Sequence, residues 1–83
     1  MLTSEAVPVI VRVMAPYIGE TMARSAADAH CQKLGVVGGS LGTEQLEALL
    51  ARLGSGLNIF LGRDKSALVI DEVRRALASE VRP

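Results

Sequence analysis

Two adjacent residues are of the types from which a catalytic site could be built. His30 and Cys31 are the only histidine and the only cysteine of the chain, and a nucleophile beside its base would need these types. On a helix, however, neighbouring side chains point about 100° apart and do not face each other. We therefore interpret His30 as the end of an apolar stripe and Cys31 as a small packed side chain.

A glycine-rich stretch, Lys33–Thr43, could in principle cradle a phosphate group. A P-loop requires a strand before its glycines and a lysine in front of the Ser or Thr that opens the next helix. Here a helical pattern comes before the glycines, and Thr43 follows a glycine. The stretch is therefore predicted to be a corner between two helices, in which Gly35 ends the first helix and Val36 folds back on Cys31 in a Schellman cap.

Clusters of carboxylates are few and lack the partners of a metal site. Asp71–Glu72 and the pair Glu44 and Glu47 are the only ones, and the chain has no Glu-x-x-His motif of the kind that binds metals in helical bundles. We predict that these carboxylates are solvated. The sequence thus predicts no catalytic residues, no cofactor and no metal, and favours a non-enzymatic protein.

Length and composition predict one small helical domain over residues 1–83. Nearly half of the residues are apolar, but only one Tyr and one Phe are present, so the core must be built from aliphatic side chains. Nine basic residues balance nine acidic ones, which argues against nucleic-acid binding. No stretch has the roughly 20 apolar residues of a membrane span. Without a signal-peptide pattern, we expect a cytoplasmic protein.

The apolar spacing predicts an all-α fold, a compact bundle of about four helices around a long central helix at 16–34. Residues 4–34 are expected to form either one kinked helix or two helices divided near Ala15, because Pro16 interrupts the pattern. Thr3 or Ser4 is the expected N-cap.

Three further segments have helical patterns. A helix is predicted over 44–53, with Thr43 as its N-cap and Gly54 as its stop. A short helix over 57–61 would bury Leu57, Phe60 and Leu61, although its alternation also permits an extended segment. The last helix should begin after Gly62 and end near Ser79. Its expected N-cap is Asp64 or Ser66, and its inward face is Val69, Ile70, Val73, Leu77 and Val81.

The run Val7–Met14 is apolar on nearly every side of a helix, with Arg12 as its only charged residue. Because a small domain can hardly enclose such a helix, we expect part of it to meet another chain. Small residues recur every four positions from Ala15 to Cys31, which would let a helix approach closely. The predicted interaction surface comprises Val7, Ile10, Val11, Met14, Ala15, Gly19, Ala23 and Ala27, and the predicted partner is a second copy, as a homodimer, or another protein.

Two other functions are compatible with the sequence. The last helix and its surroundings have basic character and could make the chain a small DNA-binding regulator, although acidic residues interleave. The basic residues are Arg63, Lys65, Arg74, Arg75 and Arg82. Alternatively, Met14, Met22 and Phe60 could cover a pocket for a small molecule.

The segment Ala15-Pro-Tyr-Ile-Gly-Glu-Thr-Met-Ala, the leucine-rich 46–53 and Phe60-Leu61 together resemble helical modules appended to bacterial serine/threonine kinases and response regulators. The resemblance covers residues 15–61, and Glu20 stands where a proline is usual. It implies an accessory role in bacterial signalling and carries over no catalytic residue.

Overall fold

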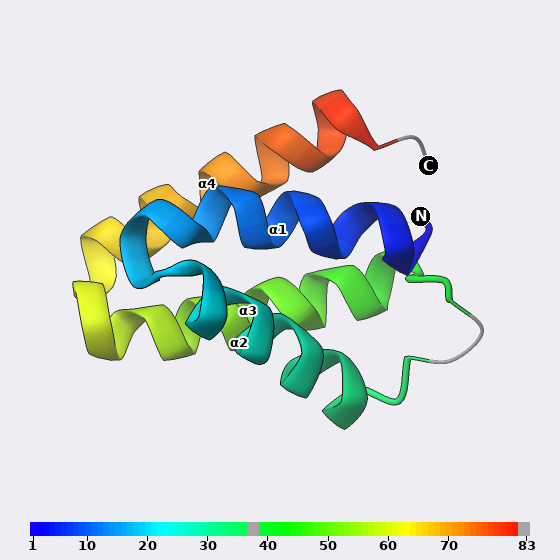
Figure 1. Ribbon diagram of the computed structural model, residues 1–83, viewed down its shortest axis with the longest axis horizontal. Coiled ribbons are helices and arrows are strands. Elements are labelled where there is room, and N and C mark those ends of the chain that lie inside the picture. Colours follow the sequence, from blue (N-terminus) through cyan, green and yellow to red (C-terminus); the bar gives the residue numbers. More distant parts are fainter. Residues whose placement is uncertain (37–38, 82–83) are drawn as a thin grey trace.

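The computed structural model describes residues 1–36 and 39–81, which fold as an all-α bundle. Its helices are α1 (Thr3–Ile18), α2 (Glu20–Lys33), α3 (Thr43–Leu61) and α4 (Arg63–Glu80). Figure 1 shows α1 lying between α4 on one side and α2 and α3 on the other. The predicted fold class is therefore confirmed.

The first helix passes through both of its prolines and stops at Gly19. Pro8 and Pro16 lie inside α1 on its exposed side, where water can reach the carbonyl groups that lose their backbone partners. Gly19 has φ +89° and ψ 151°, a conformation essentially restricted to glycine. The expected division near Ala15 is thus wrong by one turn, and the predicted helix at 16–34 is the shorter α2.

Neither Thr3 nor Ser4 caps α1. The N-cap is Leu2, which offers no side-chain hydrogen bond to the helix. The backbone N–H of Thr3 instead donates to the carbonyl of Gly39 at 2.8 Å. Beside it, the N–H of Leu41 donates to the carbonyl of Met1, also at 2.8 Å. The start of the chain is therefore held by the connector between α2 and α3.

This connector confirms the predicted corner in the part that the structure describes. Gly35 has φ +65°, and its N–H donates to the carbonyl of Gln32. The N–H of Val36 donates to the carbonyl of Cys31, which completes the Schellman motif. The loose turn expected over 38–42 lies partly outside the described residues. From Gly39 onward this turn is held to the start of the chain by the two backbone hydrogen bonds that join Thr3 to Gly39 and Leu41 to Met1.

Helix α3 is longer than predicted because Gly54 does not end it. The helix begins at Thr43 after the N-cap Gly42, whose N–H donates to Oε1 of Gln45 at 2.9 Å, and it runs on to Leu61. At Gly54, α4 comes so close that an added Cβ would lie 3.4 Å from Cγ1 of Ile70. The hydroxyl of Ser66 donates to the Gly54 carbonyl at 2.8 Å, so Ser66 bridges two helices and does not cap α4.

Residues 57–61 form the last turns of α3, so the helical alternative is confirmed. Leu57 is buried and Leu61 partly buried, but Phe60 is exposed, contrary to the prediction. Helix α4 then begins at Arg63, one residue after Gly62, and neither Asp64 nor Ser66 is its N-cap. Its predicted inward face is confirmed, with Ile70 only partly buried.

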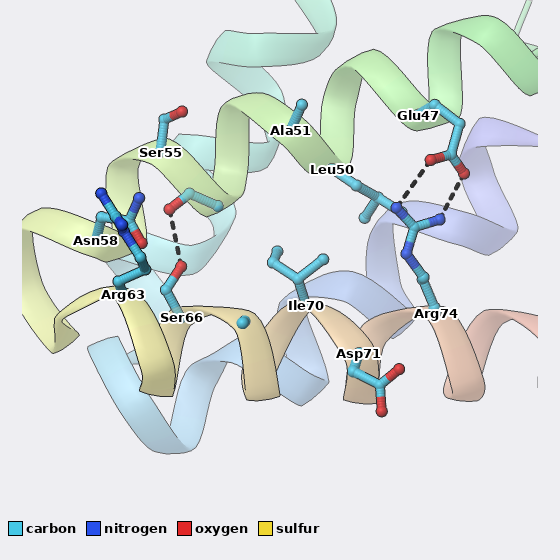
Figure 2. A pocket seen from close by; sticks show the side chains of 12 residues that line it. Glu47, Leu50, Ala51, Ser55, Asn58, Arg63, Ser66, Ile70, Asp71 and Arg74 are labelled. Atoms are coloured by element: carbon cyan, nitrogen blue, oxygen red, sulfur yellow. Dashed lines mark hydrogen bonds and ion pairs between the residues drawn. The ribbon is translucent and has the colours of Figure 1, made fainter.

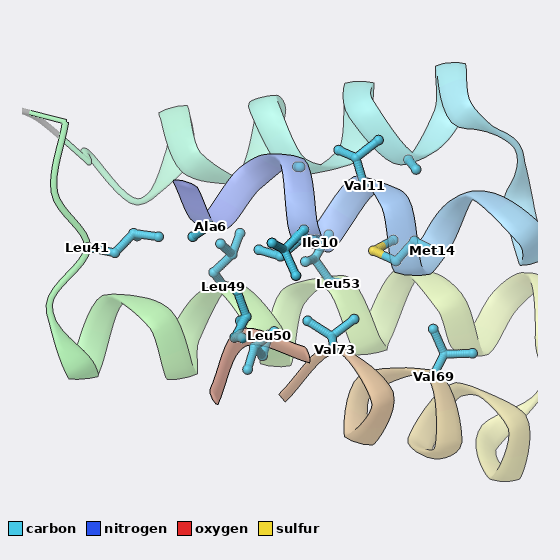
Figure 3. Close-up of a cluster of buried hydrophobic side chains, with 14 of the residues drawn as sticks. Ala6, Ile10, Val11, Met14, Leu41, Leu49, Leu50, Leu53, Val69 and Val73 are labelled. Carbon is cyan, nitrogen blue, oxygen red and sulfur yellow. The ribbon is translucent and has the colours of Figure 1, made fainter. Parts of the chain in front are cut away.

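The core surrounds α1 rather than the segment 16–34 (Figure 3). Five residues of α1 are buried, whereas α2 contributes only Ala23 and Ala27. The largest fully buried side chains are those of Ile10, Met14, Leu49, Leu50, Leu53, Leu57, Val69 and Val73. The central helix is therefore α1, because α2, α3 and α4 can together enclose an apolar helix that no single neighbour could cover.

Polar contacts on the surface connect α4 to its neighbours. Arg12 of α1 forms a two-pronged ion pair with Glu80, and the hydroxyl of Tyr17 donates to Glu72 at 2.7 Å. Arg74 binds Glu47 of α3 through two hydrogen bonds of 2.6 and 2.8 Å. Among the described residues, no helix combines the length and apolar character needed to cross a bilayer.

Candidate functional site

The structure places most of the predicted interaction surface inside the chain's own core. Five of its eight residues are buried: Ile10, Val11, Met14, Ala23 and Ala27. Val7 and Ala15 are partly buried, and Gly19 is exposed. This corrects the prediction for the five buried residues. The chain reverses at Gly19 and lays α2 along α1, so the apolar helix and the small-residue stripe cover each other.

His30 and Cys31 do not form a nucleophile and base. The pKa of the Cys31 thiol is raised by burial and then by the nearby Asp28 carboxylate, which is opposite to the activation of a cysteine nucleophile. Burial, together with the charges of Lys33 and Arg52, lowers the pKa of His30. Nδ1 of His30 is buried and has no hydrogen-bond partner. In the described part of the chain, no three His, Cys, Asp or Glu residues gather as metal ligands.

The largest hollow lies between α3 and α4 and has a volume of about 520 Å³ (Figure 2). Three of its polar side chains bond to each other or to backbone, and Ser55, Asn58, Arg63 and Asp71 also line it. Glu47 and Arg74 form the double hydrogen bond across one end, and Ser66 contacts the Gly54 carbonyl near the other. Figure 2 shows the lining side chains of both helices, with Glu47 and Arg74 bonded across from α3 to α4. The contacts of Glu47, Ser66 and Arg74 thus join α3 to α4.

A second hollow, here called the α2/α3 groove, is almost entirely apolar. It is lined by Met14, Ile18, Met22, Ala26, His30, Leu53, Gly56, Leu57 and Phe60. The hollow that the sequence suggested beneath Met14, Met22 and Phe60 is therefore present. Its volume of about 50 Å³ is well below the roughly 300 Å³ at which small-molecule pockets begin. The groove can receive a side chain but not a typical metabolite.

Large apolar side chains stand exposed at this groove. Met22 is 43% exposed and Phe60 is 60% exposed, and both line it from opposite helices. Ile59, which precedes Phe60 on α3, is 84% exposed but does not line the groove, because neighbouring side chains of a helix point about 100° apart. A gathering of exposed apolar side chains, unlike a single one, is typical of a protein interaction site. We refer to Met22, Ile59 and Phe60 as the exposed apolar cluster.

Sequence reasoning missed this cluster because it assigned Phe60 to the core. The helical spacing contained a signal: buried Leu53 and Leu57 define the inward side of α3, and Ile59 is two residues, about 200°, beyond Leu57. That signal was hidden because the sequence placed a helix end at Gly54, which separated the two parts of α3.

Comparison of the chain with known families, curated proteins and solved structures gave no match.

Proposed function

We propose that this domain is a non-enzymatic protein interaction module that binds its partner through the α2/α3 groove and the exposed apolar cluster. The observation that carries the proposal is the exposure of Met22 and Phe60 at an apolar groove, with Ile59 exposed next to Phe60 in the sequence. Fully burying a large apolar side chain contributes roughly 1.5–3 kcal/mol, so a partner that covers two of them gains a useful part of its binding free energy.

The proposed partner surface differs from the one that the sequence suggested. The run Val7–Met14 is largely occupied within the chain, whereas the exposed apolar cluster is available to another molecule. A second copy of the chain or a different protein could cover it. The sequence resemblance implies an accessory role in a bacterial signalling system, and this context is part of the proposal.

DNA binding by α4 has less support. Arg74 is bonded to Glu47, and Arg75 forms an ion pair with Asp71 at 2.8 Å. These pairs cancel two of the positive charges that contacts to phosphates would require. A gel-shift experiment at low salt would revive this alternative if it showed a complex that dissolves as salt is added.

Photo-crosslinking in the cells that make the protein tests the proposal directly. A benzophenone amino acid at position 59 should give discrete adducts, while the same residue at the exposed position Ser79, at the end of α4, should not. Phe60→Ser should remove the adducts made from position 59 without unfolding the exposed end of α3. Equal adducts from both positions, or none from position 59, would contradict the proposal.

A further inference from the structure

The α2/α3 groove has charges of one sign at one end. His30 and Leu53 line the groove at this end; Lys33 lies one helical turn after His30 on the same side of α2, and Arg52 directly precedes Leu53 on α3. Both cationic residues are exposed. The exposed apolar cluster lies toward the opposite end, where Met22 and Phe60 face the groove. The face is therefore apolar at one end and basic at the other.

Acidic residues of α2 point away from this face. Met22, Ala26 and His30 form the row of α2 that lines the groove, and Asp28 lies about 200° around the helix from Ala26. Glu20 lines a different hollow, beside Pro8 and Pro16 of α1. The exposed positions Ser25 and Ala29 between these faces are uncharged.

Acidic residues of α3 are also placed elsewhere. Glu47 is bonded to Arg74 on the side facing α4. Glu44 is in the first turn of α3, roughly 12 Å along the axis from Arg52 at 1.5 Å per residue. Within the described residues, the positive charges of Lys33 and Arg52 thus have no carboxylate beside them on this face, and an occupant of the groove would have to supply one.

We propose that the α2/α3 groove binds an amphipathic helix whose apolar side chains cover the exposed apolar cluster and whose acidic side chains meet Lys33 and Arg52. This inference rests on the proposed function and names the chemistry of its partner. Met22 and Lys33 are eleven residues apart on α2, about 16 Å, which matches three turns of a docked helix. Ala26 and Gly56, midway along the groove, leave room for close approach.

Charge complementarity favours an acidic helix over a second copy of this chain. A twofold dimer uses the same patch on both subunits. In such a dimer both copies of the groove carry the same side chains, so the partner's groove brings no carboxylate to Lys33 or Arg52. Because this face has no acidic groups, an acidic helix complements its charge, whereas a second copy of the same face does not.

A displayed peptide library provides the test. We would select 15-residue helical peptides with a fixed leucine stripe, and with polar positions drawn equally from Glu, Gln and Lys, on the intact chain. The expected result is strong enrichment of Glu over Lys. The best peptide should bind about tenfold more weakly to the Lys33→Glu/Arg52→Glu variant. The matched control Arg63→Glu/Lys65→Glu, which makes the same change in net charge at exposed positions, should bind as the parent does.

Each other result counts against the inference in a distinguishable way. No preference for Glu, equal weakening by both double variants, or binding that survives Phe60→Ser would overturn it. If position 59 still crosslinks to a partner in cells, the proposed function stands while the acidic helix is rejected. A dimer that Phe60→Ser dissociates would make a second copy the occupant. Absence of both crosslinks and enriched peptides would overturn both proposals.

Discussion

Gly54 and Gly56 lie two residues apart in α3 and have different surroundings. An added Cβ at Gly54 would press on Ile70 of α4, whereas at Gly56 it would meet nothing within 4 Å. At Gly54 an added Cβ would already touch Ile70, so a larger side chain has no room there, while Gly56 only weakens its helix through the entropy that glycine loses on folding. Two identical residues in one helix therefore respond oppositely to substitution.

Gly56→Ala should raise the free energy of unfolding by roughly 0.5–1 kcal/mol, because alanine is the better helix former and the site has space. The contrasting variant, Gly54→Leu, should lower it by about 1–3 kcal/mol through overpacking against Ile70. Urea unfolding followed by circular dichroism measures both. Equal effects at the two sites would mean that α4 does not pack as closely on Gly54 as the structure shows.

His30 should make the stability depend on pH. Burial first, and then Lys33 and Arg52, hold the pKa of His30 below its ordinary value of 6.5. As the pH falls below 6.5, the unfolded chain binds the proton before the folded chain does, so the free energy of unfolding decreases until the pH passes the folded pKa. His30→Gln should flatten this decrease between about pH 7 and about pH 5.

Urea unfolding of the parent and of His30→Gln at several pH values checks this expectation. The pKa values of Glu47 and Glu80 are also lowered, mainly by hydrogen bonds from Arg74 and Arg12, so their contributions are lost in acid too. Their ordinary value is 4.5, so that loss falls at lower pH and should persist in the variant. An unchanged slope above pH 5 would rule out His30 as the source.

At the scale of elements, the pairing of α1 with α2 decides what the small residues do. Ala23 and Ala27 are both 0% exposed, whereas Ala29, on the same helix, is exposed. Because Gly19 reverses the chain, α2 lies against the apolar helix that precedes it. The small side chains thus serve contact within the chain.

Ala23→Leu should lower the free energy of unfolding by about 1–3 kcal/mol, because the new side chain has no space between α1 and α2. Ala29→Leu is the matched control, since it adds the same atoms to an exposed position of the same helix and should change stability little. Thermal unfolding of both variants gives the comparison. A loss as large in Ala29→Leu would show that position 29 is also enclosed.

For the whole molecule, the accessible surface of the single chain is close to that expected from its mass. It measures 5025 Å², close to the roughly 4,700 Å² expected for a folded protein of this mass. The enclosure of α1 removes the large apolar face that the sequence alone would assign to a subunit interface. The large apolar side chains that remain exposed are those of Leu2, Met22, Ile59, Phe60 and Leu68.

The isolated chain should therefore be a monomer of 8.7 kDa in light scattering over a hundredfold concentration range. The physical reason is that the exposed apolar cluster is small and that a second copy of the groove brings no carboxylate to Lys33 and Arg52. Lowering the protein concentration should leave the mass unchanged. A mass that doubles as concentration rises would contradict this expectation and would support self-association instead.

Local patterns in the sequence determined the elements of this fold. The 3.6-residue apolar period predicted the inward face of α4, and a glycine after a lysine and a leucine predicted the Schellman end of α2 at Gly35. Both can be read from residues that are close together in the sequence, so no knowledge of distant contacts was needed.

Tertiary structure alone decided which glycine stops a helix and which apolar residues stay outside. Gly54 follows the same kind of residues as Gly35, yet α3 continues through it because Ser66 and Ile70 of α4 pack there. The run Val7–Met14 is mostly enclosed because three helices from the same chain surround it, while Phe60 is left exposed. The apolar period of the sequence determines which side of a helix is apolar. Whether that side is covered by helices of the same chain or left for another molecule depends on how the helices pack together.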